Sequence, residues 1–519
     1  MAEQTEQGGG QAQEPAGTEP TGRSEQTERS EQTERAEPVK GRKNGLYAGI
    51  GEELAQNMRS GWADTERDGL EPSAQAPYAA KRRKALSAAF PGERLVIPSG
   101  RHKSRSNDTD YMFRPACDYA YLTGERSDSN VLILEPKAEG GHDAALYLLP
   151  RSNREDGEFW LSGYGELWTG RRDSLTEAAA ILGLDTRDSR LAAEQLAELI
   201  GHDRSVVTRI LRGYDAELEG VVDLLAGREE EAGAELDRQL QVFLHGARLV
   251  KDEWEIEQLR EACAATTKGF TDVVRELSQA VATSERWVEG TFWRRARVEG
   301  NYVGYNSICA SGPHATTLHW TRNDGPVRPG ELLLLDAGVE TNTLYTADVT
   351  RTLPISGEFD ELQRKIYDAV YDSQEAGIAA VQPGRPYRDF HDAAQQVLAE
   401  RLVEWGLLEG PVDRVLELGL QRRFTLHGTG HMLGLDVHDC AEARCEDYVD
   451  ALLAPGMVLT VEPGLYFQQD DLTIPAEYRG IGVRIEDDIL VTATGNENLS
   501  ASLPRTADEI EHWMAGLRG

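Results

Sequence analysis

Cysteine is scarce in this sequence, and its spacing predicts no bridge or cluster. The five cysteines are an odd number among 519 residues, and only Cys440 and Cys445 lie close together. That pair is not a CxxC motif, so neither a zinc ribbon nor a thioredoxin-like redox site is indicated. We expect free thiols in a reducing compartment.

Long apolar runs are also missing. No stretch approaches the roughly 20 apolar residues that a membrane-spanning helix requires. The first residues, MAEQTEQGGGQAQ, have neither the basic nor the apolar region of a secretion signal. We therefore expect a cytoplasmic protein.

Basic residues are clearly outnumbered by acidic ones. The chain has 55 Lys and Arg against 89 Asp and Glu, which gives a formal net charge of −34. Such a surface repels nucleic-acid phosphates and anionic membranes, so we expect neither as a partner. The charge fits an enzyme that acts on small molecules or peptides. It also fits an acidic chaperone of basic proteins.

Motifs of several common chemistries are absent. The sequence has no GxGxxG after a strand, no P-loop and no GxSxG elbow. A zinc-binding HExxH helix is excluded too, because no Glu follows His427 and the GTG segment after it is a poor helix former.

Composition divides the first half of the chain. Residues 1–45 are rich in Glu, Gln, Thr, Gly and Pro, and SEQTER occurs twice in succession. With so few large apolar residues, folding cannot offset its entropy cost, so we predict a disordered acidic tail. Residues 46–75 predict a linker with one short helix. Over residues 76–245 the strand-like runs ERLVIPSG, DYAYLTG, NVLILEP and AALYLLP alternate with helical patterns, which predicts an N-terminal α/β domain.

Residues 246–519 predict an α+β catalytic domain. It opens with a helix for which Asp252 is the expected N-cap. A pair of long helices is expected between residues 358 and 408. Strands are expected on both sides of this pair, at 331–339, 346–355, 456–466 and 482–492.

Each of these four strands carries a carboxylate where a plain core would hold Val or Ile. They are Asp336, Asp348, Glu462 and Glu486. A buried carboxylate is costly unless it is paired or binds a metal. One alone is more often a cap or a surface group, but four together predict a site. Their charge would balance two divalent cations. With one imidazole from HGTGHMLGLDVHD (427–439), this set suits Mn²⁺, Mg²⁺ or Co²⁺, and two ions about 3.5–4 Å apart can share a bridging hydroxide.

The segments LLLLDAG, ADVTRT, HGTGHMLGLDVHD, LTVEPGLY and YRGIGVRIEDD, in this order, resemble the aminopeptidase P (Xaa-Pro aminopeptidase) family of pita-bread metallopeptidases. The resemblance covers nearly all of the chain after about residue 75, and RPACDYAYLTG resembles part of that family's N-terminal domain. It implies an α/β N-terminal domain followed by a pita-bread (creatinase/aminopeptidase-like) catalytic domain. It also implies two divalent metal ions, Mn²⁺ first among them, and a homo-oligomer, either a dimer or a tetramer.

Carried over position by position, the resemblance implies a set of site residues. Asp348 and Glu486 would bridge both ions, and Glu462 would also act as the general base. The implied metal ligands are Asp336, Asp348, His431, Glu462 and Glu486. The implied catalytic and substrate-binding residues are His319 and His438 near the scissile bond, and His427, Tyr466 and Arg484 around the proline.

The spacing of the first two implied ligands departs from that of the family. Eleven residues separate Asp336 from Asp348, where the family usually has ten. An extra residue inside a strand ladder would turn side chains to the other face. We expect it in the turn ETNT or in a bulge, which leaves both aspartates pointing inward.

The implied activity is removal of the N-terminal residue from peptides with proline in second position. Prolidase, which cleaves Xaa-Pro dipeptides, is the nearest alternative and would share every ligand. A pita-bread protein that binds other proteins without catalysis is a third, although such proteins normally lose ligands. Three other histidines, His314, His391 and His512, are expected to be surface or hydrogen-bonded residues, and Trp320 is expected to serve packing.

Overall fold

The computed structural model describes residues 51–107, 109–155 and 157–517. The tail predicted for residues 1–45 lies outside these stretches. The chain forms two compact units, which are described separately below. Among the helices of the described stretches, none has both the length and the apolar character needed to cross a bilayer.

The smaller unit consists of residues 51–63 and 152–170. Trp62 packs edge-on against Phe159 with ring centroids 5.2 Å apart, and the Arg154 guanidinium lies over both rings. The short helix predicted in the linker is the first helix of this unit. Its helices are α1 (Glu52–Met58), α4 (Glu158–Leu161) and α5 (Glu166–Thr169).

The larger unit begins with a mixed five-stranded sheet in the order β6-β5-β4-β1-β7. Successive side chains of a strand point to opposite faces. Val96 accordingly packs on one face with α7 and α8, whereas Leu95 and Ile97 pack on the other with α2 and α9. The sheet is therefore buried on both sides. Its strands are β1 (Arg94–Pro98), β4 (Val131–Pro136), β5 (His142–Leu148), β6 (Asp185–Asp188) and β7 (Thr208–Ile210).

One strand-like run of this region is a helix. DYAYLTG belongs to α3 (Cys117–Thr123), so its assignment as a strand-like segment was wrong. Every residue of α3 is buried, which removes the apolar periodicity that separates a helix from a strand. Gly124 ends the helix with a left-handed φ of 75°. The other elements here are α2 (Ala76–Ala89), β2 (Ser104–Ser106), β3 (Thr109–Asp110), α6 (Leu175–Leu182), α7 (Ala192–His202), α8 (Ala216–Ala226) and α9 (Glu230–Arg248).

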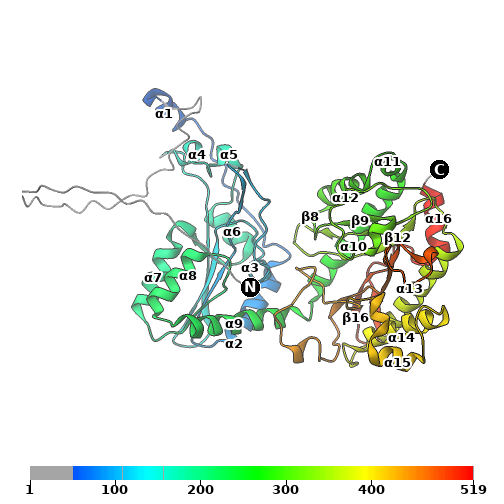
Figure 1. Cartoon of the computed structure of the whole chain (residues 1–519). Helices are drawn as coiled ribbons and strands as arrows, with labels where there is room; N and C mark the ends of the chain where they lie inside the picture. Colours follow the sequence, from blue (N-terminus) through cyan, green and yellow to red (C-terminus); the bar gives the residue numbers. More distant parts are fainter. Residues whose placement is uncertain (1–50, 108, 156, 518–519) are drawn as a thin grey trace, which may run out of the picture. The chain divides into compact units, whose positions relative to one another are not determined.

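The second half of the larger unit is an α+β region. The boundary predicted between residues 245 and 246 falls in the last turn of α9 and stays a prediction. Asp252 caps the next helix through a capping box with Glu255, as expected. The predicted long helix pair is α13 and α14, which lie side by side (Figure 1). The helices are α10 (Glu253–Arg275), α11 (Leu277–Ala282), α12 (Glu285–Glu299), α13 (Glu361–Ala380), α14 (Asp389–Glu404), α15 (Val412–Leu418) and α16 (Ala507–Leu517).

Each of the four strands expected to carry a carboxylate is shorter or interrupted, and the interruption lies at the carboxylate. Glu462 falls between β13 and β14, and Glu486 falls between β15 and β16. The pairs Val461↔Asp487 and Gly464↔Arg484 keep one register across the gap. Pro463 has no N–H to give the ladder, which accounts for the break. The strands are β8 (Tyr302–Val303), β9 (Ile308–Ser311), β10 (Leu332–Asp336), β11 (Val339–Glu340), β12 (Thr350–Pro354), β13 (Val458–Val461), β14 (Gly464–Phe467), β15 (Ile481–Arg484), β16 (Asp487–Val491) and β17 (Asn496–Asn498).

The hairpin that carries the first two aspartates has no bulge in its ladder. Asp336 pairs with Thr350 and Glu340 pairs with Thr346, so the register is unchanged from one end to the other. The irregularity lies in the turn, where Leu344 has a left-handed φ of 74°. Both aspartates therefore keep the inward orientation expected of them.

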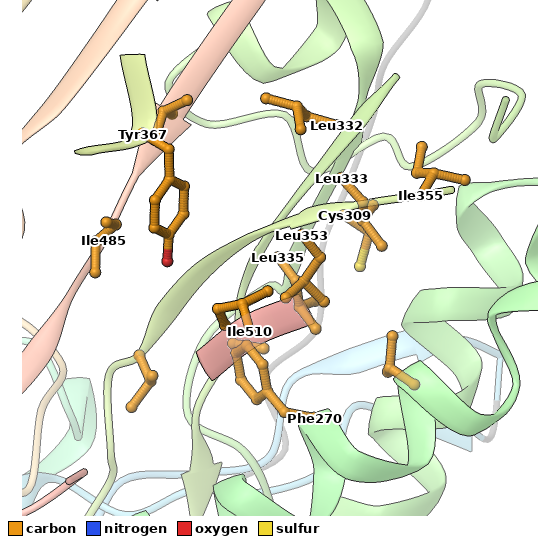
Figure 2. Close-up of a cluster of buried hydrophobic side chains, with 14 of the residues drawn as sticks. Phe270, Cys309, Leu332, Leu333, Leu335, Leu353, Ile355, Tyr367, Ile485 and Ile510 are labelled. Carbon is orange, nitrogen blue, oxygen red and sulfur yellow. The ribbon is translucent and has the colours of Figure 1, made fainter. Parts of the chain in front are cut away.

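A hydrophobic core joins many of these elements. Figure 2 shows Phe270, Leu335, Leu353, Tyr367 and Ile510 meeting in it, from α10, β10, β12, α13 and α16. On the opposite sides of β10 and β15, polar side chains face a cavity. The core thus fixes strands whose other face carries the candidate site.

Candidate metal centre and substrate pocket

A cavity of about 460 Å³ opens beside the interrupted strands. All but one of the residues that the sequence assigned to the site line it. Tyr466 is the exception; it lies behind His427 and Arg484, and its hydroxyl is hydrogen-bonded to both. The predicted residues that line the cavity are His319, Asp336, Asp348, His427, His431, His438, Glu462, Arg484 and Glu486.

The carboxylates converge on one imidazole. His431 Nε2 lies 3.3 Å from Asp348 Oδ2 and 3.5 Å from Glu462 Oε1. Potential ligand atoms of Asp348, His431 and Glu486 all lie within 4.8 Å of one another. Asp336 is not part of this group, and its Oδ2 accepts a hydrogen bond from Arg484 Nη2 at 2.5 Å.

The tautomer of His431 suits a metal ligand. Its Nδ1 lies 3.1 Å from the carbonyl oxygen of Met432, which can only accept, so Nδ1 carries a hydrogen. Nε2 then faces the carboxylates. A backbone carbonyl that orients an imidazole in this way is a common support for metal-binding histidines.

The electrostatics of the cavity favour a bound cation. Arg484 is the one permanent cation among the lining residues, against four carboxylates. Burial and the neighbouring carboxylates raise the pKa of Glu486 well above its usual range. Burial also raises the pKa of Glu462 to about 7, although His431 opposes it. Burial lowers the pKa of His431, but Asp348 and Glu462 outweigh that effect and raise it to about 9. The donor set, all carboxylate and imidazole, therefore fits divalent cations.

Tyr305 is a site residue that the sequence did not reveal. Its hydroxyl Oη lies 2.6 Å from Asp336 Oδ1 and 2.5 Å from Asp348 Oδ1. Burial and these carboxylates hold the pKa of Tyr305 well above its usual value, so the phenol remains a donor. It comes from the irregular segment between β8 and β9, where no motif points to it.

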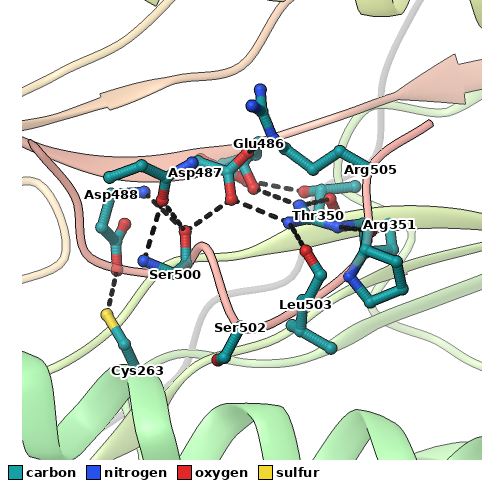
Figure 3. A network of polar contacts seen from close by, with 12 residues as sticks. Cys263, Thr350, Arg351, Glu486, Asp487, Asp488, Ser500, Ser502, Leu503 and Arg505 are labelled. Carbon is teal, nitrogen blue, oxygen red and sulfur yellow. Dashed lines mark hydrogen bonds and ion pairs between the residues drawn. The ribbon is translucent and has the colours of Figure 1, made fainter. Parts of the chain in front are cut away.

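A second layer of polar contacts holds the predicted ligands from behind (Figure 3). Thr350 Oγ1 donates to Glu486 Oε2 at 2.6 Å. Arg351 Nη1 donates to the carbonyl oxygen of Glu486 at 2.7 Å. Asp488 Oδ2 accepts from the backbone N–H of Asp348 at 3.1 Å. Thr350 and Arg351 belong to the ADVTRT segment, so the motif contains support residues as well as the predicted ligand Asp348.

One wall of the cavity is a chain of hydrogen bonds. Arg484 Nη1 donates to Tyr466 Oη at 3.0 Å, and Tyr466 Oη lies 2.8 Å from His427 Nε2. His427 Nδ1 donates to the carbonyl oxygen of Gly428, so Nε2 accepts from the tyrosine. Burial, with Arg484 nearby, lowers the pKa of His427 to about 4, which keeps the imidazole neutral. The wall is thus rigid and uncharged at its imidazole end.

Two further histidines lie at the cavity. The His438 ring stands edge-on to His431 with centroids 4.2 Å apart, and burial lowers its pKa. His319 is exposed at the mouth. The three histidines expected to lie outside the site do so. His314 bonds Glu285 at 2.8 Å, His391 bonds Thr429 at 2.8 Å, and His512 is exposed. Trp320 does not line the cavity and donates to Glu285.

The loop that carries His427, His431 and His438 lies along β13. The Thr460 N–H donates to the carbonyl oxygen of His431 at 2.9 Å, and the Glu462 N–H donates to that of Thr429 at 2.8 Å. A Cβ on Gly430 would collide with the Thr460 carbonyl oxygen. Gly430 is therefore needed for close approach to this strand, which then sets His431 opposite Glu462.

Comparisons with known proteins give consistent matches over most of the chain. Residues 257–493 match metallopeptidase family M24, and residues 79–208 match the N-terminal domain of aminopeptidase P. Xaa-Pro aminopeptidase 1 of Streptomyces coelicolor is 67% identical over 482 residues, covering 93% of this chain and 96% of that protein. Xaa-Pro aminopeptidase of Escherichia coli is 33% identical over 445 residues, covering 84% and 97%.

Solved structures show the same likeness. A variant of E. coli aminopeptidase P in complex with substrate has a TM-score of 0.77 and 32% identity, covering 86% of this chain and 99% of that one. E. coli aminopeptidase P with the inhibitor Pro-Leu has a TM-score of 0.76 and 32% identity, covering 86% and 100%. The predicted N-terminal domain and pita-bread catalytic domain are thereby confirmed.

Proposed function

The chain belongs to the Xaa-Pro aminopeptidases of metallopeptidase family M24, and we propose that the cavity described above is its active site. It is a metallo-exopeptidase that removes the first residue from peptides with proline in second position. The observation that carries the site assignment is the convergence of buried carboxylates on His431, next to the wall formed by His427, Tyr466 and Arg484.

We propose that two divalent ions, Mn²⁺ in the active enzyme, bind to Asp336, Asp348, His431, Glu462 and Glu486. Asp348 and Glu486 would hold metal together with His431, because potential ligand atoms of these three residues lie within 4.8 Å of one another. A ligand set of carboxylates with one imidazole favours Mn²⁺, whereas thiolate ligands would favour zinc. Metal bound by these residues would supply Lewis-acid polarisation of the scissile carbonyl and would lower the pKa of a bound water.

The protein's own groups handle protons and charge. Glu462 takes a proton from the attacking water and passes it to the proline nitrogen. His319, at the mouth, stabilises the carbonyl oxygen as negative charge develops on it. His438, a neutral imidazole beside His431, assists at the same stage.

Substrate selection follows from the shape and charge of the cavity. A proline amide has no N–H, so the site must select the ring by shape. His427, Tyr466 and Arg484 form a wall that their mutual hydrogen bonds keep in place. The free α-amino group of the substrate docks beside Asp336, which limits the enzyme to chain ends.

We propose that the enzyme works as a homo-oligomer, a dimer or tetramer, in the cytoplasm. The smaller unit exposes four large apolar side chains: Leu161 at 60%, Tyr164 at 62%, Leu167 at 50% and Trp168 at 61%. Such a cluster is typical of an interaction surface. The five free cysteines fit a reducing compartment.

A mass-spectrometric digest tests the activity. Purified enzyme with Mn²⁺ receives equal amounts of an Xaa-Pro dipeptide, an Xaa-Pro-Yaa tripeptide and a longer Xaa-Pro peptide. Release of the first residue from the two longer peptides is the expected result. Cleavage of the dipeptide alone would make the enzyme a prolidase. No cleavage with any divalent metal would favour a binding protein.

A further inference from the structure

A second hollow of about 620 Å³ adjoins the proposed active site. Leu318 lines both the cavity and this hollow. Tyr466 lines the hollow and bonds His427, which lines the cavity. The two spaces therefore meet at the wall that is proposed to hold the proline.

The floor and rim of the hollow are largely apolar. Phe424 and Tyr466 are buried at its base, and Leu426 is 64% exposed at its edge. Two polar lining residues satisfy each other, because Gln468 Nε2 donates to the Thr316 carbonyl oxygen at 2.6 Å. This surface suits an apolar side chain rather than a polar one.

The charged lining of the hollow is entirely positive. It contains Arg422 and Arg423 and no carboxylate. Arg423 is engaged by Asp471, with hydrogen bonds of 2.9 and 2.8 Å. Arg422 is exposed, and within residues 51–517, apart from 108 and 156, no hydrogen bond or ion pair to its guanidinium is formed. A free arginine is thus left in a chain with a net charge of −34.

We propose that this hollow binds the substrate residues that follow the proline, and that Arg422 pairs with a carboxylate carried within two residues after it. The carboxylate is either the C-terminus of a short peptide or an acidic side chain. The inference rests on the proposed function of the adjoining cavity. A peptide whose proline lies beside Leu318, which lines both spaces, leaves the cavity next to the hollow. An apolar side chain after the proline then packs on Phe424 and Leu426.

Two matched pairs of peptides test the proposal. The first pair is Xaa-Pro-Leu as the free acid and as the amide. The second is Xaa-Pro-Leu-Asp and Xaa-Pro-Leu-Asn, both amidated. An exposed ion pair favours the carboxylate member about two- to fivefold at low salt. The effect should appear in KM, because Arg422 lies away from the reacting bond. It should shrink towards one in about 1 M salt.

Variants separate Arg422 from general charge effects. R422Q should bring the KM ratio of the favoured pair close to one, and R422K should keep part of the preference. R414Q is the matched control, because Arg414 is an exposed arginine paired with Glu417 outside the hollow. It should keep the full preference.

Three results would overturn the inference. They are no preference in either pair, an unchanged preference in R422Q, or a preference that salt leaves intact. The salt series uses the unmodified enzyme, so a misfolded variant would not prevent the test. If the unmodified enzyme cleaves all four peptides equally, Arg422 has no such role and the proposed function stands. If it cleaves none of them, the proposed function itself fails.

Discussion

His431 Nε2 lies 3.3 Å from Asp348 Oδ2, although one residue comes from the glycine-rich loop and the other from the β11–β12 hairpin. Their contact depends on the loop pairing with β13 and on an undisturbed hairpin register. The two halves of the catalytic region therefore meet at the proposed metal centre. Substitutions at this centre should weaken metal binding before they destabilise the fold.

Replacing the imidazole tests that centre directly. H431A should lower both bound metal and turnover by more than about 100-fold, since even residues that only support a ligand cost about 10–100-fold. Metal content by mass spectrometry and release of the first residue from Xaa-Pro-Yaa are the readouts. The control is H512A on the exposed face of α16. Full metal content and turnover in H431A would remove His431 from the site.

Tyr305 should matter although it is not a predicted ligand. Y305F removes the hydroxyl that contacts Asp336 and Asp348. Metal affinity should fall about 10–100-fold, because the two carboxylates lose their common support. Competition with a chelator measures this, and Y111F, at a tyrosine that is 58% exposed, is the control. Equal metal affinity in both variants would show that the tyrosine contributes nothing.

Selection of the proline ring should depend on Tyr466. Y466F leaves His427 Nε2 and Arg484 Nη1 without a buried partner, which costs about 1–3 kcal/mol. We expect the ratio of kcat/KM for Xaa-Pro-Yaa over Xaa-sarcosine-Yaa to fall about tenfold, since sarcosine lacks the ring. A ratio unchanged from the unmodified enzyme would mean that this wall does not read ring shape.

Lowering the pH should destabilise the N-terminal domain, partly because Glu177 becomes protonated. Burial alone would raise the pKa of this carboxyl, but hydrogen bonds from Arg171, Arg67 and Ser174 outweigh it and hold the pKa below its usual range. The carboxylate therefore stabilises the fold above its unfolded pKa of about 4.3, and this contribution is lost as the pH falls towards the folded pKa.

The variant E177Q isolates that contribution. Its melting temperature should be lower than that of the unmodified protein at pH 7, and the difference should narrow below about pH 4.3. E139Q, at an exposed glutamate, serves as the control. A difference that is constant from pH 7 to pH 3 would contradict the role of the ionised carboxylate.

The carboxylates of the site could be predicted because four of them in strand interiors would destabilise the fold severely without a cation to balance their charge. Tyr305 could not, since its contact arises only when the segment after β8 folds over two aspartates far along the chain. The helix α3 was missed for a different reason. A fully buried run has no polar face, so its periodicity carries no information.

The interruptions of the strands could not be predicted from the alternation of side chains either. Alternation placed Arg484 and Glu486 on one face and Val483 and Ile485 on the other, and both pairs lie as predicted. The break at Glu462 depends on Pro463 in the ladder opposite Ile485, which is a property of the pair of strands. Sequence alternation describes one strand at a time.

Titration of the metal-free enzyme with Mn²⁺ tests the central claim most directly. Bound metal and release of the first residue from an Xaa-Pro-Yaa peptide are measured on the same samples. We expect no turnover without metal and full turnover at two ions per chain. Full turnover in metal-free protein, or saturation at a single ion per chain, would contradict it.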